Sequence, residues 1–272
     1  MINALTVDLE EWYHISGIDE FLENIDLNKF ANRVFNNTVK LLDIFSKHNV
    51  KATFFVLGSI AERFPALIKR VDQEGHEIAT HGFYHTQIYK QTPEEFSGEL
   101  KNAIKLLSDI IGKKILGFRA PDFSITNKSL WALDILIEQG IKYDCSVFPI
   151  KHPRYGIAGA PRLAYKIKDG LIEFPPSTIR ILNLNFPVAG GAYLRILPYN
   201  IIKAAIGHLN RGNNPANIYI HPWEIDPDQP RIKMPFSRRF AHYTNLYSTE
   251  KKLESLLKNF KFATVKEVLG IV

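Results

Sequence analysis

Short apolar runs alternate along the chain with longer stretches in which apolar residues recur every three or four positions. The short runs are rich in β-branched residues and have the length of buried strands, whereas the longer stretches have the period of amphipathic helices. The pattern predicts strands at residues 4–9, 52–57, 77–80, 115–119, 142–147, 171–174, 217–220 and 262–265.

Helices are predicted between most of these strands, at 33–48, 59–74, 92–112, 126–140, 199–211 and 248–259. The third helix has the clearest start, because Thr92 is followed directly by Pro93 and, three residues on, by Glu95. This is a capping box with proline at the first helical position. Gly112 is a suitable C-terminal stop.

Strands that alternate with helices indicate parallel pairing through right-handed crossovers. Eight strands in 272 residues favour a closed (β/α) barrel, and seven strands with a gap fit equally well. The alternative is an open doubly wound sheet, but no glycine-rich phosphate loop follows the first strand. We therefore predict one α/β domain over residues 1–272, with a proline- and glycine-rich insertion around 148–200.

The composition is that of a globular protein, with 46% hydrophobic and 23% charged residues, so the chain can bury a sizeable core. Cys145 is the one cysteine, which excludes an internal disulfide and a multi-cysteine zinc module. Any metal must therefore be bound by histidine and carboxylate ligands.

The net charge is +6 and the isoelectric point is about 9.2. We favour a solvated basic surface, and the alternative is an anionic partner such as an acidic glycan, a lipid diphosphate or a phospholipid surface. Basic residues are spread along the chain apart from a cluster at 231–239, and we expect no nucleic-acid partner because no such motif is present. Without a basic-then-apolar leader or a run of roughly 18 apolar residues, we expect no transmembrane segment and a cytoplasmic location.

Ionisable residues lie where five of the predicted strands end. In a (β/α) barrel the carboxyl ends of the strands meet on one rim, where functional residues collect. A histidine pair four residues apart says little by itself, but here it coincides with several acidic and basic groups. The residues are Asp8 and Glu10 after the first strand, His81 and His85 after the third, Arg119 at the end of the fourth, Asp144 in the fifth and His221 after the seventh.

The residue types indicate metal-assisted hydrolysis of an amide or an ester. Two histidines and one carboxylate can bind a divalent ion and leave positions open for water and substrate. Asp8 and Glu10 are two apart on an extended segment, so they share a face, and one can bind metal while the other acts as general base. Arg119 would keep that base ionised, and His221 could protonate a leaving group from across the rim.

The order of these motifs resembles the polysaccharide deacetylases of the NodB-homology type, carbohydrate esterase family 4. The pattern is T-x-D-x-E, H-x-x-x-H, R-A-P, Y-D-x-S and a late H-P, and it spans residues 5 to about 225. Each motif is weak alone, whereas five in the same order are specific. The segments TVDLEEWYH, HGFYHT, FRAPDFSI, KYDCSVFP and GGAYLRILP are similar to the subgroup associated with exopolysaccharide and O-antigen loci.

The resemblance implies a distorted (β/α) barrel and removal of acetyl groups from sugars. It also implies a divalent ion, most often Zn²⁺ and otherwise Co²⁺, Ni²⁺, Mn²⁺ or Fe²⁺. By motif position, Asp8 resembles the catalytic base, and the metal ligands correspond to Glu10, His81 and His85. Glu10 lies one position later than the aspartate of the commonest first motif and is one carbon longer.

The remaining roles are implied in the same way. Arg119 resembles the residue that holds the base, and His221 resembles the catalytic acid. Asp144 resembles a carboxylate that supports His221 or Arg119. A backbone N–H near Asp122 would help to hold the oxyanion, and Asp122 stands where many members have an aromatic residue, which bears on substrate preference.

Residues beside the predicted site have two interpretations each. Trp12 and Trp223 could stack on a sugar ring; core or lid packing fits Trp12 equally well, and Trp223 fits a pocket wall better. Arg195 fits contact with a substrate carboxylate or phosphate as well as it fits a structural salt bridge. We expect Glu11 to be a solvated loop residue and Cys145 to be a small buried one.

We therefore predict a metal-dependent deacetylase that acts on an N-acetylated sugar of a polysaccharide, an O-antigen or a lipid-linked or nucleotide-linked precursor. One alternative is another amide or ester hydrolase, such as a deformylase, an allantoinase-like enzyme or an O-acetyl esterase. The other is a non-catalytic glycan-binding protein with a decayed site, against which the full set of polar residues argues.

Overall fold

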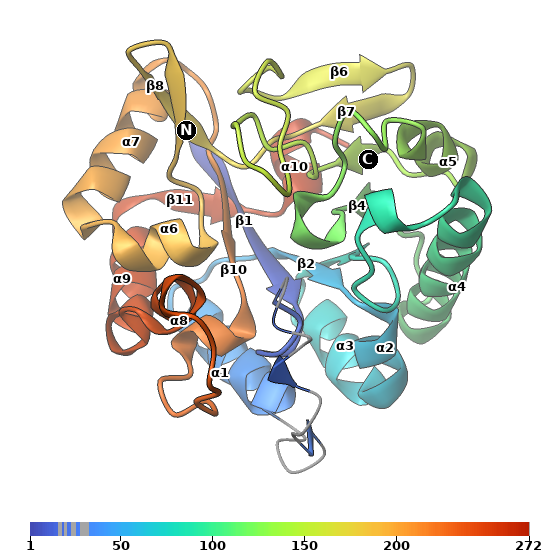
Figure 1. Cartoon of the computed structure of the whole chain (residues 1–272), viewed down its shortest axis with the longest axis horizontal. Coiled ribbons are helices and arrows are strands. Elements are labelled where there is room, and N and C mark those ends of the chain that lie inside the picture. Colours follow the sequence, from blue (N-terminus) through green and yellow to red (C-terminus); the bar gives the residue numbers. More distant parts are fainter. Residues whose placement is uncertain (16–17, 19–20, 23–25, 28–32, 272) are drawn as a thin grey trace.

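The computed structural model describes residues 1–15, 18, 21–22, 26–27 and 33–271. Its centre is a curled sheet with the strand order β10-β1-β2-β3-β4-β5-β7-β6, in which β11 also pairs with β1 (Figure 1). The strands are β1 (Ile2–Leu9), β2 (Thr53–Val56), β3 (Glu77–Thr80), β4 (Gly117–Phe118), β5 (Tyr143–Asp144), β6 (Tyr165–Lys168), β7 (Leu171–Glu173), β10 (Asn217–Ile220) and β11 (Lys261–Ala263).

The expected barrel-like α/β fold is confirmed, with every neighbouring pair parallel except β6 and β7. The barrel is distorted because its strand order ends at β10 and β6. Asn217 of β10 connects across this side: its side-chain amide donates to the Phe174 carbonyl over 2.7 Å, and its backbone carbonyl accepts from the Ser177 amide over 3.2 Å. One side-chain bond and one backbone bond thus replace part of a strand ladder.

The helices pack around this sheet as α1 (Arg33–Lys47), α2 (Gly58–Arg63), α3 (Pro65–Gln73), α4 (Pro93–Ile111), α5 (Ala132–Glu138), α6 (Gly191–Ile196), α7 (Tyr199–Arg211), α8 (Phe236–Tyr243), α9 (Leu246–Asn259) and α10 (Val265–Leu269). The capping box of α4 is confirmed, because the Thr92 hydroxyl accepts from the Glu95 amide and the Glu95 carboxylate accepts from the Thr92 amide. The predicted helix over 59–74 is instead two helices. Pro65 lacks an N–H and disfavours helical geometry at Phe64, so the chain bends there.

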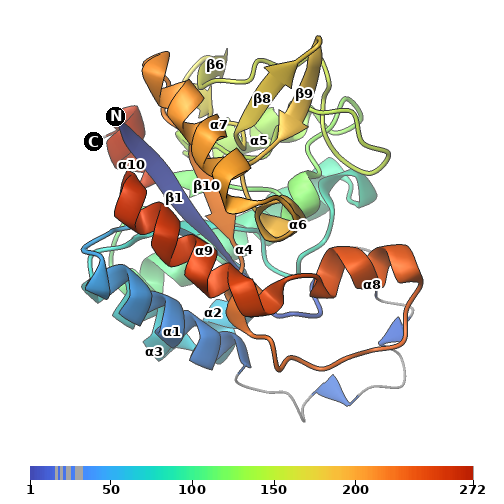
Figure 2. The same ribbon diagram turned by 90° about the vertical axis from the view of Figure 1, so that its left-hand side faces the viewer.

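Residues 148–200 were predicted to form an insertion, but part of this segment belongs to the main sheet. Strands β6 and β7 extend the main sheet beyond β5. Only β8 (Thr178–Ile181) and β9 (Leu184–Pro187) form a separate hairpin, which lies above α6 in Figure 2. Helix α6, not predicted from the sequence, follows this hairpin and reaches the open end of the barrel.

The core is mainly apolar, and all four residues of β2 and of β10 are buried, including the polar Thr53 and Asn217. A separate apolar cluster made of Trp12, Ile18, Trp223, Ile232 and Leu246 joins the loop after β1 to the segments around α8 and α9. No helix within the described ranges is long and apolar enough to cross a lipid bilayer.

Candidate active site

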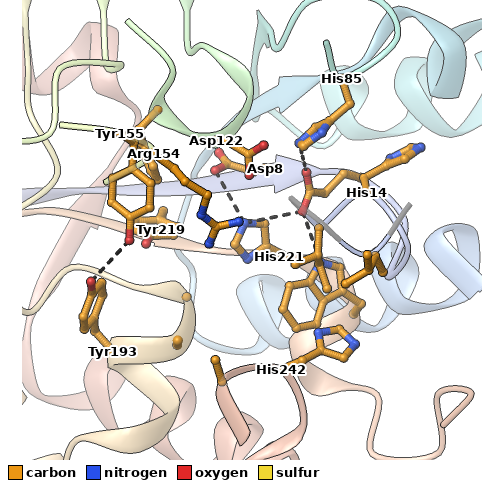
Figure 3. A pocket seen from close by; sticks show the side chains of 18 of the residues that line it. Asp8, His14, His85, Asp122, Arg154, Tyr155, Tyr193, Tyr219, His221 and His242 are labelled. Atoms are coloured by element: carbon orange, nitrogen blue, oxygen red, sulfur yellow. Dashed lines mark hydrogen bonds and ion pairs between the residues drawn. The ribbon is translucent and has the colours of Figure 1, made fainter. Parts of the chain in front are cut away.

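The carboxyl ends of β1, β3 and β10 open into one cavity of about 400 Å³ (Figure 3). The cavity is where the sequence-predicted residues meet, although they come from segments as far apart as positions 8 and 221. Three of the predicted residues, Arg119, Asp144 and Trp12, lie behind this lining. Those that line it are Asp8, Glu10, His81, His85, Asp122, Arg195, His221 and Trp223.

Glu10, His81 and His85 form a compact cluster, with one ligand atom from each lying within 4.8 Å of the other two. The Glu10 carboxylate is 2.8 Å from His85 Nε2 and 3.8 Å from His81 Nε2. All three side chains are almost fully buried. Burial lowers the pKa of His81 to about 4, so its ring is neutral, as a metal ligand must be.

The donor set fits a divalent ion. Two imidazole nitrogens and one carboxylate oxygen suit zinc and its neighbours among the transition metals, and three protein ligands leave further coordination positions open. The His81 Nδ1 lies 2.8 Å from the Arg119 carbonyl, so Nε2 is the nitrogen that faces Glu10. Burial lowers the pKa of His85, but the adjacent Glu10 outweighs it and raises that pKa above its ordinary value. A bound divalent cation would compensate the negative charge of Glu10 in place of the proton on His85.

The two histidines are held by a loop, not by a helix. His81 follows β3 directly, Gly82 has a φ of 79°, and His85 has a φ of 63°, which is uncommon for a residue with a side chain. Glu99 of α4 fixes the turn between them, because its carboxylate accepts from the amides of Phe83 and Tyr84 over 2.8 and 3.2 Å. Glu99 was not identified from the sequence, where it looks like any acidic residue of an amphipathic helix.

Asp8 is oriented by Arg119, as the sequence predicts. The guanidinium donates through Nη1 to Asp8 Oδ1 and also, over 2.9 Å, to the Thr6 hydroxyl, and it stacks 4.1 Å above the Phe55 ring. Burial lowers the pKa of Arg119, but Asp8 outweighs it and keeps the group charged. The second oxygen of Asp8 faces His221, 3.8 Å from its Nε2.

His221 faces both carboxylates across the cavity, with its Nε2 also 3.6 Å from Glu10 (Figure 3). Its other nitrogen, Nδ1, lies 3.5 Å from Glu224, at the upper limit of a hydrogen bond. Burial opposes protonation of His221, but Glu10, Glu224 and Asp8 outweigh it and raise the pKa to about 9. The ring is therefore protonated at neutral pH.

Glu224 is a supporting residue that sequence reasoning missed. It is fully buried, forms an ion pair with Arg195, and accepts at 3.3 Å from the amide of His221. The Arg195 guanidinium also donates to the Ala241 carbonyl and lies 4.9 Å from the Trp223 ring. The structural interpretation of Arg195 as a salt-bridge partner is thus the one observed, and the spacing H-P-W-E was the available signal.

Asp144 is directed away from the cavity. Its carboxylate accepts from the Ser146 hydroxyl, and it lies directly beside Glu173, its register partner on β7. Burial raises the pKa of Asp144 to about 6 and that of Glu173 well above its ordinary value, so this pair holds a proton at neutral pH. Within the described residues Asp144 forms no ion pair with His221 or Arg119, and the charge of Arg119 only partly offsets the rise that burial causes in the pKa of Asp144.

Asp122 lies on the cavity wall in a strained turn. Asp122 and Phe123 have successive φ values of 54° and 52°, a left-handed geometry that residues with side chains rarely adopt. Gln87 donates to the Asp122 carboxylate over 2.6 Å and fixes the side chain. The turn directs the backbone of the R-A-P-D segment toward the site.

Two expectations for flanking residues need correction, and two agree with the structure. Trp12 is fully buried in the apolar cluster and does not line the cavity, so it packs beneath the site. Glu11 is also buried, not solvated, and burial raises its pKa to about 7. Trp223 forms the expected wall: it stacks on His221 at 5.0 Å and donates to Glu10 over 3.2 Å. Cys145 is buried, as expected.

Several lining residues could not be found from sequence motifs. They come from the loop after β1, from the segments around 152–155 and α6, from β10 and from α8, and no spacing rule connects these elements. Aromatic rings predominate, and the hydroxyls of Tyr155 and Tyr193 lie 3.3 Å apart (Figure 3). The set comprises His14, His152, Arg154, Tyr155, Tyr193, Tyr219, Arg238 and His242.

Two family models match the chain. Residues 30–142 match the family described as Polysaccharide deacetylase, and residues 145–270 match a domain of unknown function (DUF3473). The first match covers α1 to α5, including the histidine loop and Arg119, and the second covers His221 and Glu224.

Curated relatives agree with the first match. A peptidoglycan-N-acetylglucosamine deacetylase of Bacillus cereus is 37% identical over 98 residues, which is 36% of this chain and 36% of the relative. A peptidoglycan deacetylase of Helicobacter pylori is 29% identical over 147 residues, 53% of this chain and 48% of the relative. The chain thus aligns with half or less of the length of these relatives.

Solved structures share the fold over nearly the whole chain. A putative polysaccharide deacetylase from Mycobacterium smegmatis has a TM-score of 0.62 at 18% identity and covers 98% of this chain and 88% of its own. A Puue allantoinase has a TM-score of 0.63 at 13% identity with the same coverage. At this level of identity the fold is shared, and the two similar scores do not distinguish between the two chemistries.

Proposed function

We propose that this protein removes the acetyl group from an N-acetylated sugar by hydrolysis, because residues 30–142 match the polysaccharide deacetylase family and a peptidoglycan deacetylase is 37% identical over 98 residues. The observation that carries this proposal is the facing arrangement in the cavity. A carboxylate held by arginine, Asp8, and a protonated imidazole, His221, face each other over 3.8 Å beside a cluster suited to a divalent ion.

In the proposed mechanism Asp8 accepts a proton from the attacking water. Arg119 keeps Asp8 ionised, and its hydrogen bond to one oxygen leaves the other directed into the cavity. A divalent ion, when bound by Glu10, His81 and His85, would polarise the acyl carbonyl as a Lewis acid. Zn²⁺ is the ion that we propose, because the donor set is two nitrogens and one oxygen.

His221 donates the proton that the leaving amine requires. The carboxylates that face it keep it charged until the carbon–nitrogen bond breaks. We assign the backbone N–H of Asp122 as an additional donor to the oxyanion, because the strained turn brings this segment to the cavity wall. The products are acetate and a free amino sugar.

The cavity supports a sugar as the substrate class. A volume of about 400 Å³ is within the range of small-molecule sites, and Tyr155, Tyr193, Tyr219 and Trp223 provide aromatic surface. Such faces pack well against the apolar side of a pyranose ring. In agreement with the motif resemblance, we propose a glycan of the exopolysaccharide or O-antigen type, or its precursor. We further propose that it is processed in the cytoplasm.

An acetate-release assay with measured metal content tests this proposal. The purified protein is loaded with Zn²⁺ and presented with N-acetylglucosamine oligomers, a UDP-N-acetylated sugar, an O-acetylated sugar, a formylated amino sugar and allantoin. We expect acetate only from the N-acetylated sugars, and only with the ion bound. Turnover of allantoin, the formamide or the ester alone would assign a different hydrolase, and glycan binding without any turnover would support the non-catalytic alternative.

A further inference from the structure

Helix α8 exposes aromatic side chains to solvent beside the cavity. Phe236 is 81% exposed and Phe240 is 47% exposed, and their rings lie 6.1 Å apart on the same face of the helix. Exposed phenylalanine pairs are unfavourable in water unless something covers them. The exposed rings of Phe236 and Phe240 therefore indicate a surface that binds another molecule.

Cations surround these rings. The segment 231–240, RIKMPFSRRF, which we call the basic aromatic segment, contains four cationic residues and no acidic one. Arg231, Lys233 and Arg239 are exposed, and Arg231 also stacks 4.3 Å above the Tyr243 ring. A short helix with exposed aromatic rings and flanking Arg and Lys has the composition of an interfacial membrane helix.

Contacts with buried residues attach the basic aromatic segment to the rest of the domain. His242 at the end of α8 is buried against Trp223, at 4.8 Å between ring centroids, and the Ala241 carbonyl accepts from Arg195. The same helix lines the cavity through Arg238, Ala241 and His242, facing α6. Figure 2 shows α8 projecting from the molecule below α6.

We propose that the basic aromatic segment docks on the surface of an anionic phospholipid bilayer, with Phe236 and Phe240 inserted at the level of the headgroups. Positive charge complements anionic lipid, and the rings supply the apolar contact that a purely electrostatic surface lacks. Docking would hold the cavity next to the bilayer, where a lipid-anchored glycan could reach it. Membrane binding itself does not depend on the proposed deacetylase activity.

Sedimentation with vesicles tests the proposal. The full chain is mixed with vesicles of phosphatidylcholine alone or of equal parts phosphatidylcholine and phosphatidylglycerol. We expect binding only to the anionic vesicles, and weaker binding as salt rises because the attraction is screened. Phe236→Ser with Phe240→Ser should abolish most of it, and Arg239→Gln should weaken it by about fivefold, the usual contribution of one cation near an anionic surface.

A matched control distinguishes binding through α8 from non-specific binding of the protein surface to vesicles. Arg239→Gln with Phe240→Ser removes one exposed cation and one exposed apolar side chain from α8. Lys128→Gln with Leu130→Ser removes the same kinds of group from an exposed loop before α5, on another side of the molecule (Figure 1). Only the first pair should reduce binding to the anionic vesicles.

The outcomes are distinct. Lack of binding to anionic vesicles, or equal loss in both matched pairs, would overturn the proposal. A shift from dimer to monomer caused by Phe236→Ser with Phe240→Ser, without vesicle binding in either protein, would assign the surface to a second copy instead. Acetate release from a soluble oligomer should be unchanged in this variant, so a failed membrane test leaves the proposed chemistry standing.

Discussion

The two sides of the cavity are built differently. On the metal side, which comprises Asp8, Glu10, His81, His85 and Arg119, each side chain leaves a strand end or its adjoining loop, and Arg119 forms a buried ion pair with Asp8. On the histidine side, which comprises His221, Glu224 and Arg195, orientation depends on buried charges from two segments, the turn after β10 and α6.

This difference predicts different responses to substitution. A strand end stays in place when one side chain changes, so substitution of the ligands Glu10, His81 or His85 should lower activity with a small loss of stability; the buried Asp8–Arg119 ion pair is the exception on the metal side. A chain of buried charges has no such support, because removing one partner leaves another charge buried and uncompensated. On the histidine side, loss of activity and loss of stability should therefore accompany each other.

The largest expected effect is on kcat, and it distinguishes the roles of the two carboxylates of the metal side, Asp8 and Glu10. Asp8→Asn should lower kcat by about a thousandfold, since it removes the general base, while the bound metal content stays unchanged. Glu10→Gln should lose activity together with the metal, because Glu10 belongs to the ligand cluster. Elemental analysis alongside initial rates measures both. If Asp8→Asn lost the metal and Glu10→Gln kept it, the two roles would be exchanged.

The next effect concerns the histidine side. Glu224→Gln should lower kcat by about tenfold to a hundredfold with little change in KM, because Glu224 contacts His221 and does not line the cavity. It should also cost about 3 kcal/mol of stability, since Arg195 is left buried without its carboxylate. Steady-state kinetics and thermal unfolding measure the two quantities.

A double variant tells positioning from packing. Glu224→Leu with Arg195→Met removes both buried charges, so we expect stability to recover relative to Glu224→Gln while kcat stays low. Glu224→Asp should recover part of kcat, because the carboxylate is kept. Full recovery of kcat in the double variant would mean that Glu224 only supports the fold.

A smaller effect tests the histidine loop. Glu99→Gln replaces the carboxylate that accepts from the Phe83 and Tyr84 amides, so His85 should be held less firmly. We expect about tenfold weaker metal affinity, the lower end of the effect of residues that orient ligands. Competition against a chelator gives the affinity. The matched control is Glu94→Gln, an exposed position in the first turn of the same helix, which should change nothing.

The smallest effect lies behind the metal side, in Asp144 and Glu173. Because burial raises the pKa of Asp144 from 3.8 to about 6, its contribution to stability is full below about pH 4 and is lost as the pH rises through about 6. Asn cannot ionise, so Asp144→Asn should gain stability relative to the wild type over this window. Melting temperatures at several pH values measure the trend, and Asp109→Asn on the exposed face of α4 should show none. A constant offset for Asp144→Asn would contradict the assigned burial cost.

The strand ends of the first half were predictable because local rules determine them. Alternating apolar runs placed all eight predicted strands. T-x-D-x-E spans the end of β1, and H-x-x-x-H and R-A-P directly follow β3 and β4, so the parallel order of these strands fixes where the motifs meet. The break at Phe64 follows from Pro65 and was visible in principle. The composition and the lone cysteine limited any metal site to histidine and carboxylate ligands.

By itself, then, the sequence determined the α/β class, the positions of eight strands and most of the residues that line the cavity, whereas β6, β8 and β9 were not predicted. Only the tertiary structure decided that Glu224 and not Asp144 faces His221, that Arg195 is an ion-pair partner, and that Trp12 packs beneath the cavity. The physical reason is that a buried charge is placed by whichever opposite charge lies close enough to offset its desolvation. For Arg195 that partner, Glu224, lies on another element of the fold, which no local periodicity encodes.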